Sequence, residues 1–274
     1  MSLPRSPLTR SAIVTRLRAA GCVFAEDEAQ LLIEAADAPA DLAAMVDRRA
    51  TGEPIEHVVG WAEFYGLRVV VDPGVFVPRR RTEFLVRLAV SLAWQAAKRR
   101  PVVVDLCCGS GAVAAALASA LAGAEVHAAD IDPAAVRCAR RNLAAAGGTV
   151  YQGDLFAPLP AALRGRVDIL AANVPYVPSD AVGSLPREAR LHEPLAALDG
   201  GRDGLDVLRR VATEAAAWLA PGGGLLTETS EGQAEQAVGI VARHGLAARV
   251  ARNVELNATV VTGIRLRPPA SPPA

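Results

Sequence analysis

Two short segments of the chain carry residue types that could do chemistry, and the first is a glycine turn. Residues 102–106 form an apolar run, and Gly109 and Gly111 follow it just before a helical pattern. Glycine permits positive φ and a close backbone approach, which a ligand lying across the tip of a strand requires. Asp130 ends the next apolar run, where a carboxylate can accept hydrogen bonds from both ribose hydroxyls of a nucleoside. The spacing predicts a nucleoside site, although two glycines alone are also typical of an ordinary tight turn.

This turn lacks one feature of dinucleotide-binding turns. Ala114 stands where their third glycine would be, which predicts a ligand without a pyrophosphate. Asp105, at the tip of the first run, has two interpretations. It meets a cationic amino group of the ligand, or it caps the amides of the turn itself.

The second segment is Asn173-Val174-Pro175-Tyr176, which follows the apolar run 167–172. In a doubly wound sheet, ligands gather beyond the carboxyl ends of the strands, so Asn173 is expected close to whatever lies over Gly109. The alternative is a loop in which Asn173 caps backbone groups and Tyr176 belongs to the core.

The composition excludes several kinds of enzyme. Lys98 is the only lysine among 29 basic residues. A phosphate-binding Walker loop, a pyridoxal Schiff base and a Tyr-x-x-x-Lys dehydrogenase site each need a placed lysine. Lys98 is flanked by arginines at an expected helix end and is interpreted as a solvated charge.

Charge, cysteine and histidine content give further expectations. The 29 acidic residues balance the basic ones, which argues against stable binding of nucleic acid through phosphate neutralisation. The four cysteines show no C-x-x-C spacing and the four histidines are scattered, so no metal site is predicted. No signal peptide or membrane span is recognised, and we expect a cytoplasmic monomer.

Hydrophobic periodicity indicates the elements that must position these residues. Helices are predicted over residues 11–20, 25–36, 39–49, 82–97, 112–121, 133–146, 207–219 and 233–244, with Thr82 as an N-cap. A β-hairpin is predicted within 56–77. Strands are predicted over 102–106, 125–129, 150–151, 167–172, 223–229, 246–250 and 259–266. Strands alternating with helices are typical of a doubly wound, mainly parallel α/β sheet, here with seven strands.

The chain is accordingly divided into four parts. Residues 1–52 are expected to be a small helical domain, 53–78 a hairpin linker, 79–267 the catalytic α/β domain and 268–274 a disordered proline-rich tail.

The chain resembles the HemK-type protein glutamine methyltransferases, which modify peptide chain release factors. That family ends its fourth strand in Asn-Pro-Pro-Tyr, and this chain has Asn-Val-Pro-Tyr at 173–176. The similarity extends to Pro-Arg-x-x-Thr-Glu at 78–83, Gly-Asp-Leu-Phe at 153–156 and Gly-Gly-x-Asp-Gly-Leu at 200–205, and covers residues 10 to 265. It implies a class I, Rossmann-like methyltransferase fold, S-adenosylmethionine as cofactor, and recognition of the substrate protein by the helical domain.

The resemblance also assigns roles to residues. It implies cofactor contacts from Asp105, Cys107, Gly109, Gly111, Asp130, Asp154, Leu155 and Asn173, with Arg79 and Thr82 near the methionine end of the cofactor or the substrate. Leu155 can equally be core, and the run Arg79–Arg81 can equally be a solvated patch that meets an acidic partner or RNA.

The chemistry itself follows from the second segment. An amide nitrogen is a poor nucleophile because its lone pair is delocalised. The Asn173 side-chain oxygen and the Val174 main-chain carbonyl can each accept one N–H of a substrate amide and aim the lone pair at the methyl group, which is catalysis by positioning. Pro175 restricts Val174 to an extended backbone, and Tyr176 packs on the amide or walls the pocket.

Two positions depart from the family pattern. Val174 replaces a proline, which leaves the required carbonyl in place and makes the acceptor less certain. Cys107 and Cys108 replace small residues in the cofactor turn.

The leading hypothesis is therefore methylation of a glutamine side chain in a release factor. The alternatives are methylation of an exocyclic amine of RNA, DNA or a small molecule, and a non-catalytic relative that binds S-adenosylmethionine. A nicotinamide dehydrogenase is disfavoured because the third glycine and a catalytic lysine are missing.

Overall fold

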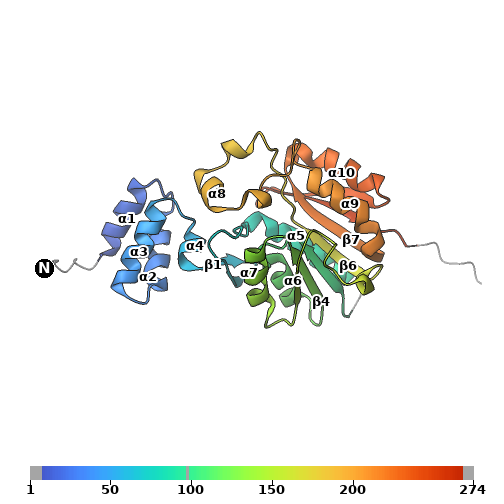
Figure 1. The fold of residues 1–274 in the computed structure, drawn as a ribbon, viewed down its shortest axis with the longest axis horizontal. Coiled ribbons are helices and arrows are strands. Elements are labelled where there is room, and N and C mark those ends of the chain that lie inside the picture. Colours follow the sequence, from blue (N-terminus) through green and yellow to red (C-terminus); the bar gives the residue numbers. More distant parts are fainter. Residues whose placement is uncertain (1–7, 97–98, 268–274) are drawn as a thin grey trace, which may run out of the picture.

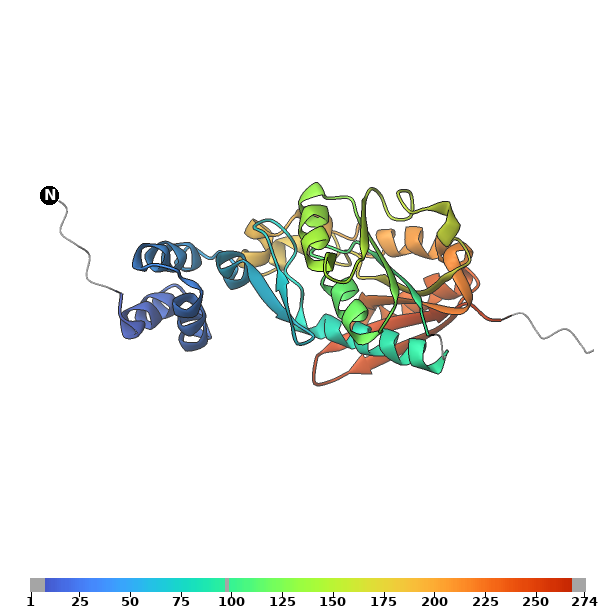
Figure 2. The same cartoon turned by 90° about the horizontal axis from the view of Figure 1, so that it is seen from below.

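The computed structural model describes residues 8–96 and 99–267, which form a helical bundle, a short hairpin and a larger α/β unit (Figure 1). The bundle lies at one end of the molecule in both views (Figures 1 and 2). Its helices are α1 (Arg10–Ala19), α2 (Ala25–Ala35), α3 (Pro39–Ala50) and α4 (Ile55–Val59). Ile13, Leu17 and Leu32 are fully buried at its centre. Each helix is too short to be stable alone, so this shared core holds the bundle together.

The hairpin is shorter than the sequence predicts. Helix α4 occupies the start of the predicted hairpin and ends at Gly60, whose φ of +82° only glycine adopts easily. The hairpin then pairs β1 (Trp61–Phe64) with β2 (Leu67–Val70) in antiparallel register. Asn142 fastens it to the α/β unit, because its side chain accepts from the Val70 N–H (2.9 Å) and donates to the Val70 carbonyl (2.8 Å).

The α/β unit is built on the predicted seven-stranded sheet, in the order β5-β4-β3-β6-β7-β9-β8. The strands are β3 (Val102–Leu106), β4 (Glu125–Asp130), β5 (Thr149–Gln152), β6 (Val167–Ala172), β7 (Leu219–Thr229), β8 (Ala247–Asn253) and β9 (Ala258–Ile264). Strand β9 runs antiparallel to both of its neighbours, β7 and β8, whereas the pairs from β5 to β7 are parallel. The predicted fold class is confirmed, and the main difference is that β7 begins four residues before the predicted 223.

Helices cover both faces of this sheet. The helices of one face are α5 (Glu83–Gln95), α6 (Ala112–Ala120) and α7 (Pro133–Leu143), and those of the other are α9 (Asp206–Trp218) and α10 (Ala234–Arg243). Val103 packs into the first layer, whereas its neighbours Val102 and Val104 pack into the second. A strand buried on both faces is hydrophobic throughout, which is why the parallel strands appear in the sequence as continuous apolar runs.

Strand order reverses between β3 and β6, which lie side by side with Leu106 opposite Ala172. From β3 the sheet continues outward to β4 and β5, and from β6 it continues in the opposite direction to β7. Ligands of doubly wound sheets bind at such a switch point, beyond the carboxyl ends of the strands. The glycine turn after β3 and the Asn173 segment after β6 therefore start from adjacent positions.

Some predictions made from the sequence concern residues that the structure does not describe. Lys98 and the tail 268–274 lie outside the described residues. Among the helices that the structure describes, none has the length and apolar character needed to cross a membrane.

Candidate active site

A cavity of about 910 Å³ lies at the switch point. Most of the residues singled out in the sequence line it: Arg79, Thr82, Asp105, Cys107, Gly109, Asp130, Asn173, Val174, Pro175 and Tyr176. The bundle contributes Phe24 and Arg49 to its outer part, and the segment 185–198, which carries α8 (Arg187–His192), contributes its roof. The cavity joins both chemistry-bearing segments in one site.

The two positions of the turn, 109 and 111, require glycine for different physical reasons. Gly109 (φ +54°) lines the cavity, and a Cβ there would have as its nearest neighbour the Cβ of Phe76 at 4.0 Å, so the glycine leaves ligand space open. Gly111 (φ +78°) begins α6, and its Cβ would lie 2.9 Å from the Cβ of Ala139 on α7. Gly111 therefore permits close packing of two helices and does not line the cavity.

Asp130 braces this turn from the tip of β4. One carboxylate oxygen accepts from the Gly109 N–H (2.8 Å) and the other from the Asp132 N–H (2.9 Å). Each oxygen retains a further lone pair, which suits a ribose diol. Burial raises the pKa of Asp130, and the two backbone N–H groups counteract this.

Asp105 makes the capping contact that was one of its two interpretations, and its place in the cavity is compatible with the other. Its side chain accepts from the Ala114 N–H at 3.0 Å, so it caps α6, and it also lines the cavity. Burial raises its pKa to about 8, with the nearby Asp130 adding to the effect. Asp105 is a buried carboxyl that a cationic group in the cavity would help to ionise.

The Asn173 side chain is the most informative group in the cavity. Its Oδ1 is buried and has no hydrogen-bond partner among the described residues. Buried polar atoms are nearly always paired, and a buried acceptor without a partner costs about 1–3 kcal/mol. The expected alternative, in which Asn173 caps backbone groups, would pair this oxygen. The open acceptor instead suits a ligand N–H.

Tyr176 is held by Glu228, a residue that the sequence interpretation missed. The Tyr176 hydroxyl donates to Glu228 Oε1 at 2.8 Å. Burial and the Glu228 charge raise the pKa of the phenol, so the hydroxyl stays protonated and remains a donor. Glu228 lies one residue before the end of β7, and an acidic side chain there was the available signal, because parallel strands end at one edge of the sheet.

Thr82 also contacts Glu228, and it stands at the N-cap position of α5 as predicted, although its side chain does not cap the helix. Thr82 has helical backbone angles and forms no side-chain cap; its hydroxyl donates to Glu228 Oε2 at 2.7 Å. Arg81 Nε donates to Glu228 Oε1 at 3.0 Å. The buried carboxylate thus has three donors, which is how a charge is tolerated in an interior.

Arg79 fastens the roof of the cavity. Its guanidinium bonds both carboxylate oxygens of the buried Glu193 at 2.5 and 2.6 Å, and Glu193 also accepts from the Val77 N–H. Arg49 of the bundle reaches Glu188 in α8 at 3.4 Å. Of the run Arg79–Arg81, therefore, Arg79 and Arg81 form ion pairs within the molecule.

Besides Gly111, two predicted cofactor residues lie apart from the cavity. Asp154 forms an ion pair with Arg210 at 2.5 Å, and Leu155 is a buried member of the core beneath α9. Both line a separate hollow beside Trp218. Within the described ranges, no group of three or more His, Cys, Asp or Glu residues is placed to hold a metal ion.

Comparisons with known proteins identify the family. A model described as the methyltransferase small domain matches residues 66–185. A release factor glutamine methyltransferase of Geobacter sulfurreducens is 42% identical over 212 residues, covering 76% of this chain and 72% of the relative. This chain belongs to the release factor glutamine methyltransferase family. It is an S-adenosylmethionine-dependent methyltransferase, as the sequence predicted.

A solved structure and a second curated protein are also similar to this chain. A solved methyltransferase structure from Pyrococcus furiosus shares the fold, with a TM-score of 0.52 at 15% identity, over 73% of this chain and 90% of that one. A 4-amino-L-phenylalanine/4-methylamino-L-phenylalanine methyltransferase of Streptomyces pristinaespiralis is 42% identical over 186 residues, covering 67% of this chain and 63% of the relative.

The cavity of this methyltransferase fits S-adenosylmethionine. Gly109 leaves room over the turn, Asp130 offers acceptors for a ribose, and Asp105 offers a carboxyl for an amino group. The unpaired Asn173 oxygen lies in the same cavity and takes no part in this fit.

Proposed function

We propose that this methyltransferase transfers a methyl group to the side-chain amide nitrogen of a protein glutamine, in a peptide chain release factor. The observation that carries the proposal is the buried, unpaired Asn173 Oδ1 at the carboxyl end of β6, in the same cavity as Gly109 and Asp130. The printed name of the Geobacter relative supports the release factor as substrate.

The residues of the cavity act by positioning the acceptor. Asn173 Oδ1 accepts one N–H of the glutamine amide and the Val174 main-chain carbonyl accepts the other, which turns the nitrogen lone pair out of conjugation. S-adenosylmethionine supplies the electrophilic methyl group and a neutral leaving group. Tyr176, fixed by Glu228, walls the acceptor site. No proton has to leave before methyl transfer, so His192 is given no role as a base.

We further propose that the bundle recognises the substrate protein. The proposed division of labour is substrate recognition by residues 1–52, linkage by 53–78 and catalysis by 79–267. Val23 and Phe24, between α1 and α2, are large apolar side chains that are 82% and 68% exposed and line the outer cavity. Exposed apolar side chains beside a binding cavity are typical of protein contacts.

The test is transfer of labelled methyl from S-adenosylmethionine to purified release factors, with the modified residue located by mass spectrometry. We expect label on a glutamine with the wild type. Asn173→Ala should lower kcat/KM about 10²–10³-fold, the usual effect of removing one preorganised polar contact. Label on an RNA pool and none on the factors would overturn the proposed substrate.

A second candidate acceptor is an aromatic amine, which the Streptomyces pristinaespiralis relative favours by its printed name. An arylamine nitrogen also carries two N–H groups and a delocalised lone pair, so the same two acceptors suit it. Methylation of 4-amino-L-phenylalanine with a higher kcat/KM than of release factors would favour this candidate.

A further inference from the structure

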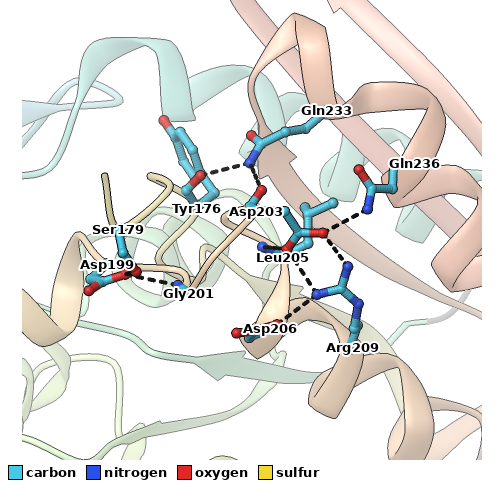
Figure 3. Close-up of polar contacts among 10 residues, drawn as sticks. All are labelled: Tyr176, Ser179, Asp199, Gly201, Asp203, Leu205, Asp206, Arg209, Gln233 and Gln236. Atoms are coloured by element: carbon cyan, nitrogen blue, oxygen red, sulfur yellow. Dashed lines mark hydrogen bonds and ion pairs between the residues drawn. The ribbon is translucent and has the colours of Figure 1, made fainter. Parts of the chain in front are cut away.

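The loop that carries the acceptor groups is held on its far side by Gln233, at the start of α10. Its Nε2 donates to the Tyr176 carbonyl at 2.9 Å and to the Asp203 carbonyl at 2.8 Å (Figure 3). Gln233 is 9% exposed and its amide lies outside the chemistry proposed above. It joins the Asn173–Tyr176 loop to the turn 198–205.

The orientation of the Gln233 amide is fixed at its other end. Its Oε1 accepts from the Ser230 hydroxyl at 2.6 Å and from the Ser230 N–H at 3.3 Å. A backbone N–H can only donate, so the oxygen must face Ser230 and the NH₂ must face the two carbonyls. The amide has one arrangement that satisfies all its partners.

Glycines let the turn 198–205 approach the loop backbone. A Cβ on Gly204 would overlap the Tyr176 carbonyl oxygen and Gln233 Nε2, and a Cβ on Gly200 would lie 2.6 Å from the Pro175 carbonyl oxygen. The Val177 N–H donates to the Leu198 carbonyl (3.0 Å), and the Gly200 N–H donates to the Val177 carbonyl (2.8 Å). The turn therefore packs backbone against backbone on the loop.

Asp203 anchors this turn to the helices beneath it. Its carboxylate accepts from the Leu205 N–H at 3.1 Å, from Arg209 of α9 and from Gln236 Nε2 at 2.7 Å (Figure 3). Arg209 is the main cause that lowers the Asp203 pKa. Gln233 and Gln236 are neighbours on the same helical segment, but only Gln233 reaches Tyr176.

From these contacts we propose that Gln233 is a positioning residue for methyl transfer. By holding the Tyr176 carbonyl against the anchored turn, it sets the path of the loop and hence the direction in which Asn173 Oδ1 and the Val174 carbonyl point. The inference rests on the proposed role of those two acceptors. A displacement driven by positioning is sensitive to such changes, since a shift of about 1 Å can cost about 10²-fold in rate.

The test compares Gln233→Glu and Gln233→Met with the control Glu235→Gln, at an exposed position of the same helix. Glutamate at 233 keeps the acceptor for Ser230 but presents an oxygen to the two carbonyls, and methionine removes the donors without adding charge. We expect both Gln233 variants to lower kcat by about tenfold or more while the Kd for S-adenosylmethionine, from calorimetry, stays within about twofold. Glu235→Gln should retain the wild-type kcat.

The outcomes separate this inference from the proposed function. Wild-type kcat in folded Gln233 variants overturns it, as does a loss shared equally by kcat, cofactor affinity and thermal stability. If the wild type is inactive on release factors but active on the aromatic amine, only the proposed substrate is overturned. The role of Gln233 is then tested by comparing kcat of the variants on the amine. Inactivity on both acceptors overturns both proposals.

Discussion

Asn173 and Glu228 are polar residues of one cavity with opposite surroundings. Glu228 receives donors from Arg81, Thr82 and Tyr176, whereas Asn173 Oδ1 has none among the described residues. A satisfied carboxylate fixes its neighbours in place, and an unsatisfied buried amide oxygen gains free energy when a substrate N–H arrives. At the residue scale, Glu228 provides rigidity, and in the proposed function Asn173 provides binding.

Val174→Pro tests the departure from the family motif. The group required of residue 174 is its main-chain carbonyl, which proline also has, and the side chain is buried rather than central to the cavity chemistry. We expect kcat/KM for a release factor to change by less than about threefold, since extended backbone is already imposed by Pro175. Steady-state kinetics of methyl transfer measure this. A loss above tenfold would show that the valine itself shapes the acceptor site.

Asp105→Asn tests the buried carboxyl. Its pKa is raised to about 8 in the free protein, so below that pH the carboxyl is protonated. A cationic amino group beside it favours the carboxylate, so binding of S-adenosylmethionine should release a proton, and affinity should rise as pH rises toward 8. Calorimetry in two buffers with different ionisation heats measures the proton release. Asp105→Asn should abolish it, while Asp130→Asn should not; equal release from Asp105→Asn and wild type would contradict the assignment.

At the element scale, the two glycines of the turn between β3 and α6 serve different purposes. Gly109 keeps the ligand side open and Gly111 lets α6 pack closely on α7. Both residues have positive φ, so the conformational cost of an alanine is comparable at the two positions. A difference in stability between the two alanine variants therefore reflects the space available to the added methyl group.

Gly111→Ala and Gly109→Ala form a matched pair. The new methyl group at 111 would lie 2.9 Å from the Ala139 Cβ, whereas that at 109 would have no heavy atom closer than 4.0 Å. We expect Gly111→Ala to lower the free energy of unfolding by about 1–3 kcal/mol more than Gly109→Ala does. Denaturant unfolding measures this. Calorimetry should show the larger loss of S-adenosylmethionine affinity for Gly109→Ala, and the reverse order would contradict the assignment.

At the scale of the whole molecule, the cavity is assembled from all three parts of the chain. The α/β unit supplies its floor and, through Arg79, ties down the roof. Phe64 of the hairpin lines the cavity, and Arg49 connects the bundle to the roof. Figures 1 and 2 show the bundle at one end of the molecule and not over the sheet, and its residues Phe24 and Arg49 line the cavity.

Phe24→Ala tests the proposed recognition by the bundle. Removal of an apolar anchor should raise KM for an intact release factor by about 5–30-fold, which corresponds to roughly 1–2 kcal/mol. The Kd for S-adenosylmethionine and the unfolding free energy should remain unchanged. Val254→Ala is the control, because Val254 is 94% exposed and lies between β8 and β9. Equal effects of both variants on KM would contradict the proposed role.

The sequence predicted the elements well where local pattern decides them. The apolar runs 102–106 and 167–172 coincide with β3 and β6, and the Asn173 segment follows the second. The errors concern side chains whose partners are distant in the chain. Thr82 is bonded to Glu228, 146 residues away, instead of capping its own helix. The start of the predicted hairpin is a helix, because the turn of α4 completes the apolar core of the bundle.

By itself, then, the sequence determined the order of strands and helices, the glycine turn and the Asn173 segment, because periodicity and glycine conformation act over a few residues. Only the tertiary structure decided which polar side chains meet: Tyr176 with Glu228, Arg79 with Glu193, and Gln233 with the Tyr176 carbonyl. Hydrogen bonds act over about 3 Å, and which residues come within that distance depends on how the strands are ordered in the sheet.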